Sequence, residues 1–119
     1  YVTTLLGRRR YIPELASPDL AIRQFGERIA VNAPIQGTAA DLIKRAMVRL
    51  AEALEASSVR SRMVVQVHDE LLVECPRTEV ATVIPLIRQS MEGAMSLTVP
   101  LTVVVKTGPS WRELTPLAA

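Results

Sequence analysis

Apolar and polar positions at the start of the chain predict a β-hairpin. Residues 1–6 are β-prone, Gly7 permits a turn, and residues 8–12 can return as a second strand before Pro13 stops it. The sequence begins inside this pattern and has no initiator methionine. We therefore expect it to be a fragment of a longer protein.

The next stretch predicts a helix that begins at Ser17-Pro18, an N-cap hydroxyl followed by proline at the first helical position, and runs to about Val31. Its apolar residues recur on one face: Ile22, Phe25 and Ile29. The residue before a proline avoids helical geometry, so Pro34 predicts a break near Asn32.

A second helix is expected from about Pro34. Its apolar residues recur at intervals of three and four: Ala39, Leu42, Ile43, Ala46, Met47, Leu50, Ala53 and Leu54. Charged residues take the other faces: Asp41, Lys44, Arg45, Arg49, Glu52 and Glu55. This amphipathic pattern predicts a helix that covers a sheet.

In the middle of the chain, two apolar runs are separated by three polar residues. The runs, residues 63–67 and 71–74, predict two strands joined by a tight turn, although Asx-Gly turn chemistry is absent. His68, Asp69 and Glu70 would lie at or beside the turn. Such a turn can hold carboxylates open to water, metal or substrate, and an ordinary solvated hairpin tip is the alternative.

The last third of the chain predicts a helix and a strand. Residues 76–94 have apolar positions at helical spacing, and Pro85 inside them predicts a kink. Residues 101–106 alternate in polarity and predict a last strand before a Gly-Pro pair. Trp111 is expected to anchor the short tail.

This order of elements predicts the α+β class. It is close to the split β-α-β-β-α-β arrangement, an antiparallel sheet covered by helices on one face, with the central hairpin supplying neighbouring strands. No linker or repeat divides the sequence, so residues 1–119 are expected to form a single unit. Many functions use this arrangement, so the chemistry must come from particular residues.

Composition and charge narrow the function classes. The 49% hydrophobic and 22% charged content is ordinary for a soluble domain, and 3% aromatic residues disfavour base stacking as the main activity. A single cysteine, no signal peptide and no membrane-length apolar run favour a reducing, cytoplasmic setting. Residues 1–63 carry ten Lys/Arg against six Asp/Glu, which suggests a polyanion partner.

Few residues are candidates for metal binding or catalysis. Asp69 and Glu70 are hard oxygen ligands suited to Mg²⁺, which takes one or two protein carboxylates plus water and substrate phosphates. One histidine and one distant cysteine fall short of the usual zinc ligand set. A Cys/His nucleophile pair stays open, but Cys75 lies in an apolar strand, where cysteine is more often core.

Two polar sets are candidates for nucleic-acid contacts. The run Arg8-Arg9-Arg10 can bind phosphates or form a solvated edge. A second set steps along the sequence at intervals of four: Arg28, Asn32 and Gln36. Their types suit hydrogen bonds to groove edges and sugars, and a capped helix end with a polar surface is the alternative.

Several of these stretches resemble the family A DNA polymerases, the bacterial DNA polymerase I type. Gln66-Val67-His68-Asp69-Glu70 resembles their motif C. TLLGRRRYIP at residues 4–13, ERIAVNAPIQGTAAD at residues 27–41 and the closing Val99-Pro100-Leu101 with Gly108 and Trp111 match in order. The resemblance covers nearly the whole chain. The related single-subunit RNA polymerases resemble His-Asp-Ser at motif C, so Glu70 favours the DNA enzyme.

The resemblance implies that the chain is the C-terminal part of a polymerase palm. It implies that Asp69 is one of two aspartates that hold a pair of Mg²⁺ ions and that Glu70 is a nearby carboxylate with a less strict role. His68 would help to seat the primer end. The implied partners are primer-template DNA and deoxynucleoside triphosphates, without a membrane, in a monomeric parent enzyme at the bacterial nucleoid.

The same resemblance implies the DNA contacts. Arg28, Asn32 and Gln36 would face the minor groove of the primer-template duplex near its growing end, where the acceptors are nearly the same for every correct pair. The turn formed by Arg8, Arg9 and Arg10 would touch the phosphate backbone.

The family's other metal-binding aspartate and its fingers helix belong to earlier motifs that these residues do not contain. We therefore expect a polymerase as the parent protein and no primer extension by the 119 residues alone. Two alternatives stay open: a non-catalytic nucleic-acid-binding module of palm-like fold, and a small ligand-binding regulatory domain.

Overall fold

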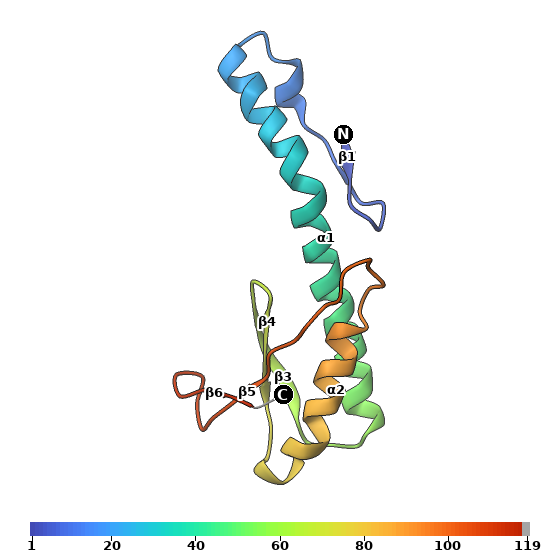
Figure 1. Cartoon of the computed structure of the whole chain (residues 1–119), viewed down its shortest axis with the longest axis vertical. Coiled ribbons are helices and arrows are strands. Elements are labelled where there is room, and N and C mark those ends of the chain that lie inside the picture. The colour runs from blue at the N-terminus through green and yellow to red at the C-terminus, as the bar shows by residue number, and fades with distance from the viewer. Residues whose placement is uncertain (118–119) are drawn as a thin grey trace. The chain divides into compact units, whose positions relative to one another are not determined.

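The structure is a computed structural model that describes residues 1–117. The chain forms two compact units, Tyr1–Leu42 and Ile43–Ala119. Helix α1 (Leu20–Ala56) contributes its beginning to the first unit and its end to the second (Figure 1). The two units are described separately.

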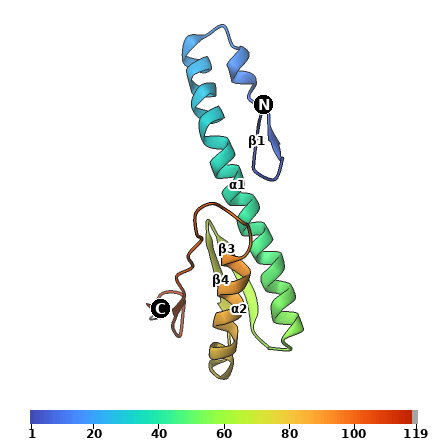
Figure 2. The same cartoon turned by 45° about the vertical axis from the view of Figure 1, so that its right-hand side comes forward.

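The first unit opens with the predicted hairpin. β1 (Val2–Thr3) pairs antiparallel with β2 (Arg9–Arg10), and a 3-10 turn, η1 (Pro13–Ala16), follows. Gly7 has φ 82°, a left-handed conformation that glycine adopts without steric cost, so it closes the turn as predicted. The hairpin lies beside the first half of α1 (Figure 2).

Helix α1 is continuous, so the predicted break near Asn32 is wrong. Pro34 lies inside its 37 residues. The avoidance of helical geometry before proline is a local bias, whereas a long helix gains one hydrogen bond for every further residue it orders. The helix therefore continues even though Pro34 donates no N–H to the carbonyl of Ala30.

The start of α1 also differs from the prediction. Asp19 caps the helix, because its Oδ1 accepts the N–H groups of Ala21 at 2.8 Å and Ile22 at 3.2 Å. Ser17 instead accepts the N–H of Asp19 through its hydroxyl. Along this part of the helix the predicted apolar face is half exposed, with Phe25 at 50%.

The second unit contains the main core. β3 (Arg62–Val67) pairs antiparallel with β4 (Glu70–Glu74), and η2 (Arg77–Glu79) leads into α2 (Val80–Glu92). The end of α1 and α2 both pack on one face of this hairpin. The core contains these residues: Leu50, Leu54 and Val83, with Val59, Met63, Leu71, Val73, Cys75, Leu86 and Ile87 against them.

This core carries more stability than the ion pairs at its surface. Leu50 is fully buried, and burial of a leucine side chain stabilises a fold by about 1.5–3 kcal/mol. Arg62 and Glu74 form an ion pair of 2.7 Å between exposed side chains, a type that contributes roughly 0–1 kcal/mol. The last part of the apolar stripe predicted for the second helix covers the hairpin through Leu50 and Leu54, whereas Ala39 at its beginning is exposed.

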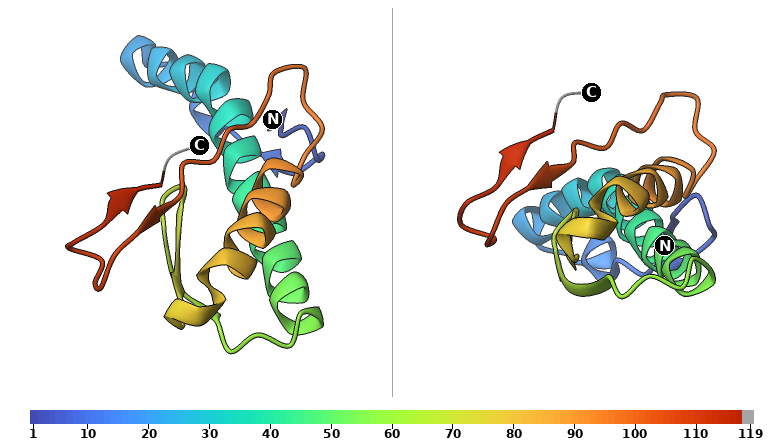
Figure 3. Two further views of the ribbon diagram at one scale, coloured as in Figure 1. Left: turned by 60° about the horizontal axis from the view of Figure 1, so that its bottom comes forward. Right: turned by 90° about the horizontal axis from the view of Figure 1, so that it is seen from below.

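The last predicted strand is only partly correct. Residues 101–105 alternate in burial as expected, but the ladder forms later, between β5 (Lys106–Thr107) and β6 (Thr115–Pro116) (Figure 3). The N–H of Val103 donates to a carboxylate oxygen of Glu92 at 3.0 Å instead of to a strand. Trp111, the expected anchor, is 52% exposed.

The α+β class is confirmed, with helices on one face of the central hairpin. Among residues 1–117, the strands form three separate two-stranded sheets instead of one sheet. Helix α2 runs through Pro85, and the kink there stays a prediction. No helix in this described part of the chain is long and apolar enough to cross a membrane.

Candidate functional site

The turn of the central hairpin consists of His68 and Asp69. Val67 pairs with Glu70 across it, so Glu70 begins β4. His68 has φ 53°, a left-handed conformation that is uncommon for residues other than glycine. The side-chain N–H of Gln66 donates to the carbonyl oxygen of His68 at 2.6 Å and supports this conformation.

Sequence reasoning placed His68, Asp69 and Glu70 at this turn, and the structure agrees. It did not identify the role of Gln66, because a side-chain contact to a turn carbonyl leaves no periodic signal. The two turn residues and Glu70 are all exposed, so their polar groups are open to solvent and ligands.

A β-bulge lies in β3 before the turn. Met63 is opposite Val73 and Val65 is opposite Leu72, which leaves Val64 as the extra residue. The bulge shifts the alternation of side chains along β3. As a result Val65 and Leu72 share the face of the hairpin away from the core.

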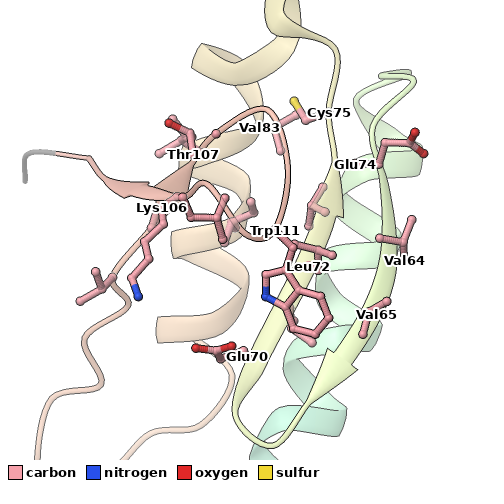
Figure 4. A pocket seen from close by; sticks show the side chains of 18 of the residues that line it. Val64, Val65, Glu70, Leu72, Glu74, Cys75, Val83, Lys106, Thr107 and Trp111 are labelled. Carbon is pink, nitrogen blue, oxygen red and sulfur yellow. The ribbon is translucent and has the colours of Figure 1, made fainter.

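That outer face borders an open cleft of about 1050 Å³. Its walls include Val65, Leu72 and Trp111, and Glu70 belongs to its lining (Figure 4). Asp69 also lines it. The carboxylates therefore stand beside an apolar surface. Sequence reasoning did not connect Trp111 to this cleft, because the two segments are far apart in the chain.

The carboxylates fit a magnesium site only in part. Asp69 and Glu70 supply hard oxygen atoms on adjacent residues, within the one or two carboxylates that Mg²⁺ takes from a protein. Within residues 1–117, no group of three or more His, Cys, Asp or Glu side chains is arranged to hold a metal ion. Asp69 and Glu70 would thus supply only part of the oxygen ligands that a Mg²⁺ ion needs.

The structure does not support a Cys/His nucleophile pair. His68 precedes β4 and Cys75 follows it, and a strand of this length rises by about 3.3 Å per residue, which separates the two side chains. Cys75 packs against the hydrophobic core. It is therefore a core residue.

The candidate DNA-binding residues lie in the first unit. Arg28, Asn32 and Gln36 are exposed on α1, and the continuous helix keeps their spacing of four residues on one side. The guanidinium of Arg28 lies 5.8 Å from the ring centre of Phe25. The structure therefore presents these three residues as one row.

The three arginines of the hairpin have different surroundings. Arg8 is held by an ion pair to Asp41, with Nε 2.8 Å from Oδ1. Arg9 lies over the ring of Tyr1 at 4.8 Å, and Tyr1 meets Tyr11 edge to face. Arg9 and Arg10 are both exposed in β2.

Comparison with known proteins identifies the family. Residues 1–113 match DNA polymerase family A, and the chain belongs to this family. DNA polymerase I of Bacillus subtilis is 51% identical over 113 residues, which cover 95% of this chain and 13% of that protein. DNA polymerase I of Mycobacterium tuberculosis is 52% identical over 111 residues, with coverage of 93% and 12%.

A solved structure agrees with this assignment. The polymerase domain of Pol1 from M. smegmatis, in complex with DNA primer-template and dNTP, is 50% identical with a TM-score of 0.89. The similarity covers 92% of this chain and 19% of that chain. The present chain spans about an eighth of the length of the curated relatives named above.

Proposed function

We propose that these residues are the C-terminal part of the palm of a longer, monomeric DNA-directed DNA polymerase of the bacterial cytoplasm, at the nucleoid. The enzyme would add nucleotides to a primer 3′-hydroxyl by a two-Mg²⁺ mechanism, with primer-template DNA and deoxynucleoside triphosphates as partners. The observation that carries the proposal is the family match over residues 1–113, which includes the turn with Asp69.

The residues of the turn would have separate roles. Asp69 would be a metal ligand, Glu70 a second and less strict carboxylate, and His68 a contact to the primer end. Bound Mg²⁺ would activate the primer hydroxyl and stabilise the leaving pyrophosphate. The exposure of Asp69 and Glu70 beside the cleft supports this assignment, because a ligand and solvent can both reach their oxygens.

The DNA contacts would come from the first unit. The row formed by Arg28, Asn32 and Gln36 has donors that suit the acceptors of the minor groove. The exposed guanidinium groups of the β1–β2 hairpin would contact backbone phosphates. Both sets are in solvent, and α1 keeps the row on one side of the helix.

Asp69→Asn in the parent polymerase tests the catalytic role. The amide keeps the shape of the side chain and removes the charge that holds a cation, so we expect nucleotide incorporation to fall by a factor of about 100 or more, about 3 kcal/mol of transition-state stabilisation. Single-turnover incorporation measures this, and Glu52→Gln on the exposed surface of α1 is the control.

Two outcomes separate the alternatives. Unchanged incorporation by the Asp69→Asn enzyme would favour a non-catalytic binding module. A small-ligand regulatory domain would instead show no loss of duplex affinity as salt rises, because it would release no counterions from DNA.

A further inference from the structure

A group of polar contacts joins the β1–β2 hairpin to α1 at Asp41. One carboxylate oxygen of Asp41, Oδ2, accepts the hydroxyl of Thr4 at 2.6 Å, and the other, Oδ1, accepts Nε–H of Arg8 at 2.8 Å. The side chain of Asp41 is 11% exposed, whereas that of Arg8 is 51% exposed. The acid is thus covered by the hairpin that it binds.

Further hydrogen bonds support the same contact. Nη2 of Arg8 donates to the carbonyl oxygen of Gly37 at 2.9 Å, and the N–H of Leu5 donates to the hydroxyl of Thr38 at 3.1 Å. A Cβ atom on Gly37 would lie 2.6 Å from Cγ2 of Thr4, so a larger residue there would force Thr4 to shift. The hairpin is therefore fixed to α1 through Thr4, Leu5 and Arg8.

These contacts give Arg8 surroundings that differ from those of Arg9 and Arg10. Two of the five N–H donors of the Arg8 guanidinium bond an acid and a carbonyl oxygen of α1, and the acid also offsets the charge that would attract a phosphate. Arg9 and Arg10 follow it in β2 and are exposed. They pair with β1 and directly follow the residue that α1 holds.

We infer that Asp41 is a positioning residue for DNA binding, because it holds Arg8 and thereby places Arg9 and Arg10 at a set position relative to the groove-facing row of α1. Arg8 then serves as an internal link, and Arg9 and Arg10 are the phosphate contacts. The inference rests on the DNA contacts proposed above and adds an acid to the residues on which they depend.

The charge of Asp41 makes the inference testable. Removal of an acid from a DNA-binding unit lowers the repulsion of phosphates and ordinarily tightens binding. If Asp41 positions the arginines, its neutralisation has the opposite effect. The measurement is the dissociation constant of the parent polymerase for a primer-template duplex at several salt concentrations. It distinguishes tighter binding from weaker binding after Asp41 is neutralised.

We expect Asp41→Asn to weaken binding by roughly three- to tenfold and to lower the salt slope by about 1 for each phosphate that the protein no longer neutralises. Arg8→Lys keeps the charge but cannot form the forked interaction with Asp41 and Gly37, so it should weaken binding in the same direction. Glu27→Gln, an exposed acid of the same unit, is the matched control and should leave binding equal or tighter.

The double variant Arg9→Ala/Arg10→Ala completes the test. It should weaken binding by itself, and Asp41→Asn should add little in its background, because both act through the same interactions with DNA. A destabilised fold alone would not produce this non-additivity. Thermal melting identifies any variant that is unfolded at the assay temperature. If Asp41→Asn is unfolded there, the affinity of the Arg8→Lys enzyme tests the inference.

The outcomes separate the inference from the proposed function. Wild-type affinity of both Asp41→Asn and Arg8→Lys, with weaker binding by Arg9→Ala/Arg10→Ala, would overturn the positioning role and leave the hairpin as a phosphate contact. Wild-type affinity of Arg9→Ala/Arg10→Ala would overturn the proposed hairpin contact, and the inference with it.

Discussion

At the scale of single residues, Glu79 joins the loop after α1 to the start of α2. Its carboxylate accepts the N–H groups of Arg60 and Ser61 at 3.0 Å and the hydroxyl of Ser61 at 2.6 Å. The Ser61 hydroxyl, followed by the Arg60 N–H, holds the pKa of the Glu79 carboxyl below its ordinary value of 4.5, because these donors stabilise the charged form.

This lowered pKa predicts a pH dependence. The charged Glu79 stabilises the fold above its unfolded pKa of 4.5, and the contribution is lost as pH falls through the lower folded pKa. We expect Glu79→Gln to lower the melting temperature at neutral pH and the difference from wild type to narrow below pH 4.5. Melting curves across this range measure it.

Glu55→Gln, at the exposed end of α1, is the control and should change the melting temperature little at any pH. A difference between Glu79→Gln and wild type that stays constant as pH falls would contradict the assigned role of the charge.

At the scale of elements, α1 shows how a long helix includes a proline. Pro34 lacks the N–H that would bond the carbonyl of Ala30, and an internal proline costs about 3 kcal/mol. The next turn of the helix has a side-chain contact to this proline: the hydroxyl of Thr38 donates to the carbonyl oxygen of Pro34 at 2.6 Å. The residues on both sides continue the helix.

Replacement of this proline should therefore stabilise the chain. Pro34→Ala restores the hydrogen bond, and the gain of about 3 kcal/mol exceeds the loss of about 0.4–1 kcal/mol from a more flexible unfolded chain. We expect a net gain of roughly 2 kcal/mol in the free energy of unfolding, measured by urea denaturation. Pro34→Gly should gain about 1 kcal/mol less. A lower stability of Pro34→Ala would show that the proline is preferred at this position.

At the scale of the whole molecule, the proposed metal ligands are two adjacent residues. Asp69 and Glu70 stand at one turn, and the described residues provide no group of three ligands for a metal ion. The relatives named above are several times longer. The activity of a polymerase thus requires groups besides those described, under the function proposed here.

The purified 119-residue chain should accordingly fail to extend a primer. Two metal ions between a triphosphate and a primer need more carboxylates than this turn supplies. Extension of a labelled primer with Mg²⁺ and deoxynucleoside triphosphates measures the activity, with the parent enzyme as the positive control. Template-dependent extension by the isolated chain would contradict the proposal.

The sequence by itself determined most of the elements and the family. Hairpins, the amphipathic stripe of α1 and the turn at His68-Asp69 follow from local periodicity and turn chemistry, which neighbouring residues decide. The same locality explains the errors. The rule for residues before proline predicted a break in a helix that is continuous, and alternation in residues 101–106 predicted a strand, whereas the ladder forms only from Lys106 onward.

Only the tertiary structure decided which polar groups meet. Arg8 finds Asp41 across 33 residues, and Glu79 finds the Ser61 N–H and hydroxyl across 18. Such partners carry no periodic signal, because hydrogen bonds between distant segments depend on how the backbone brings them together. For the same reason the sequence did not distinguish the three arginines, whereas in the fold Arg8 pairs with Asp41 and Arg9 lies over the ring of Tyr1.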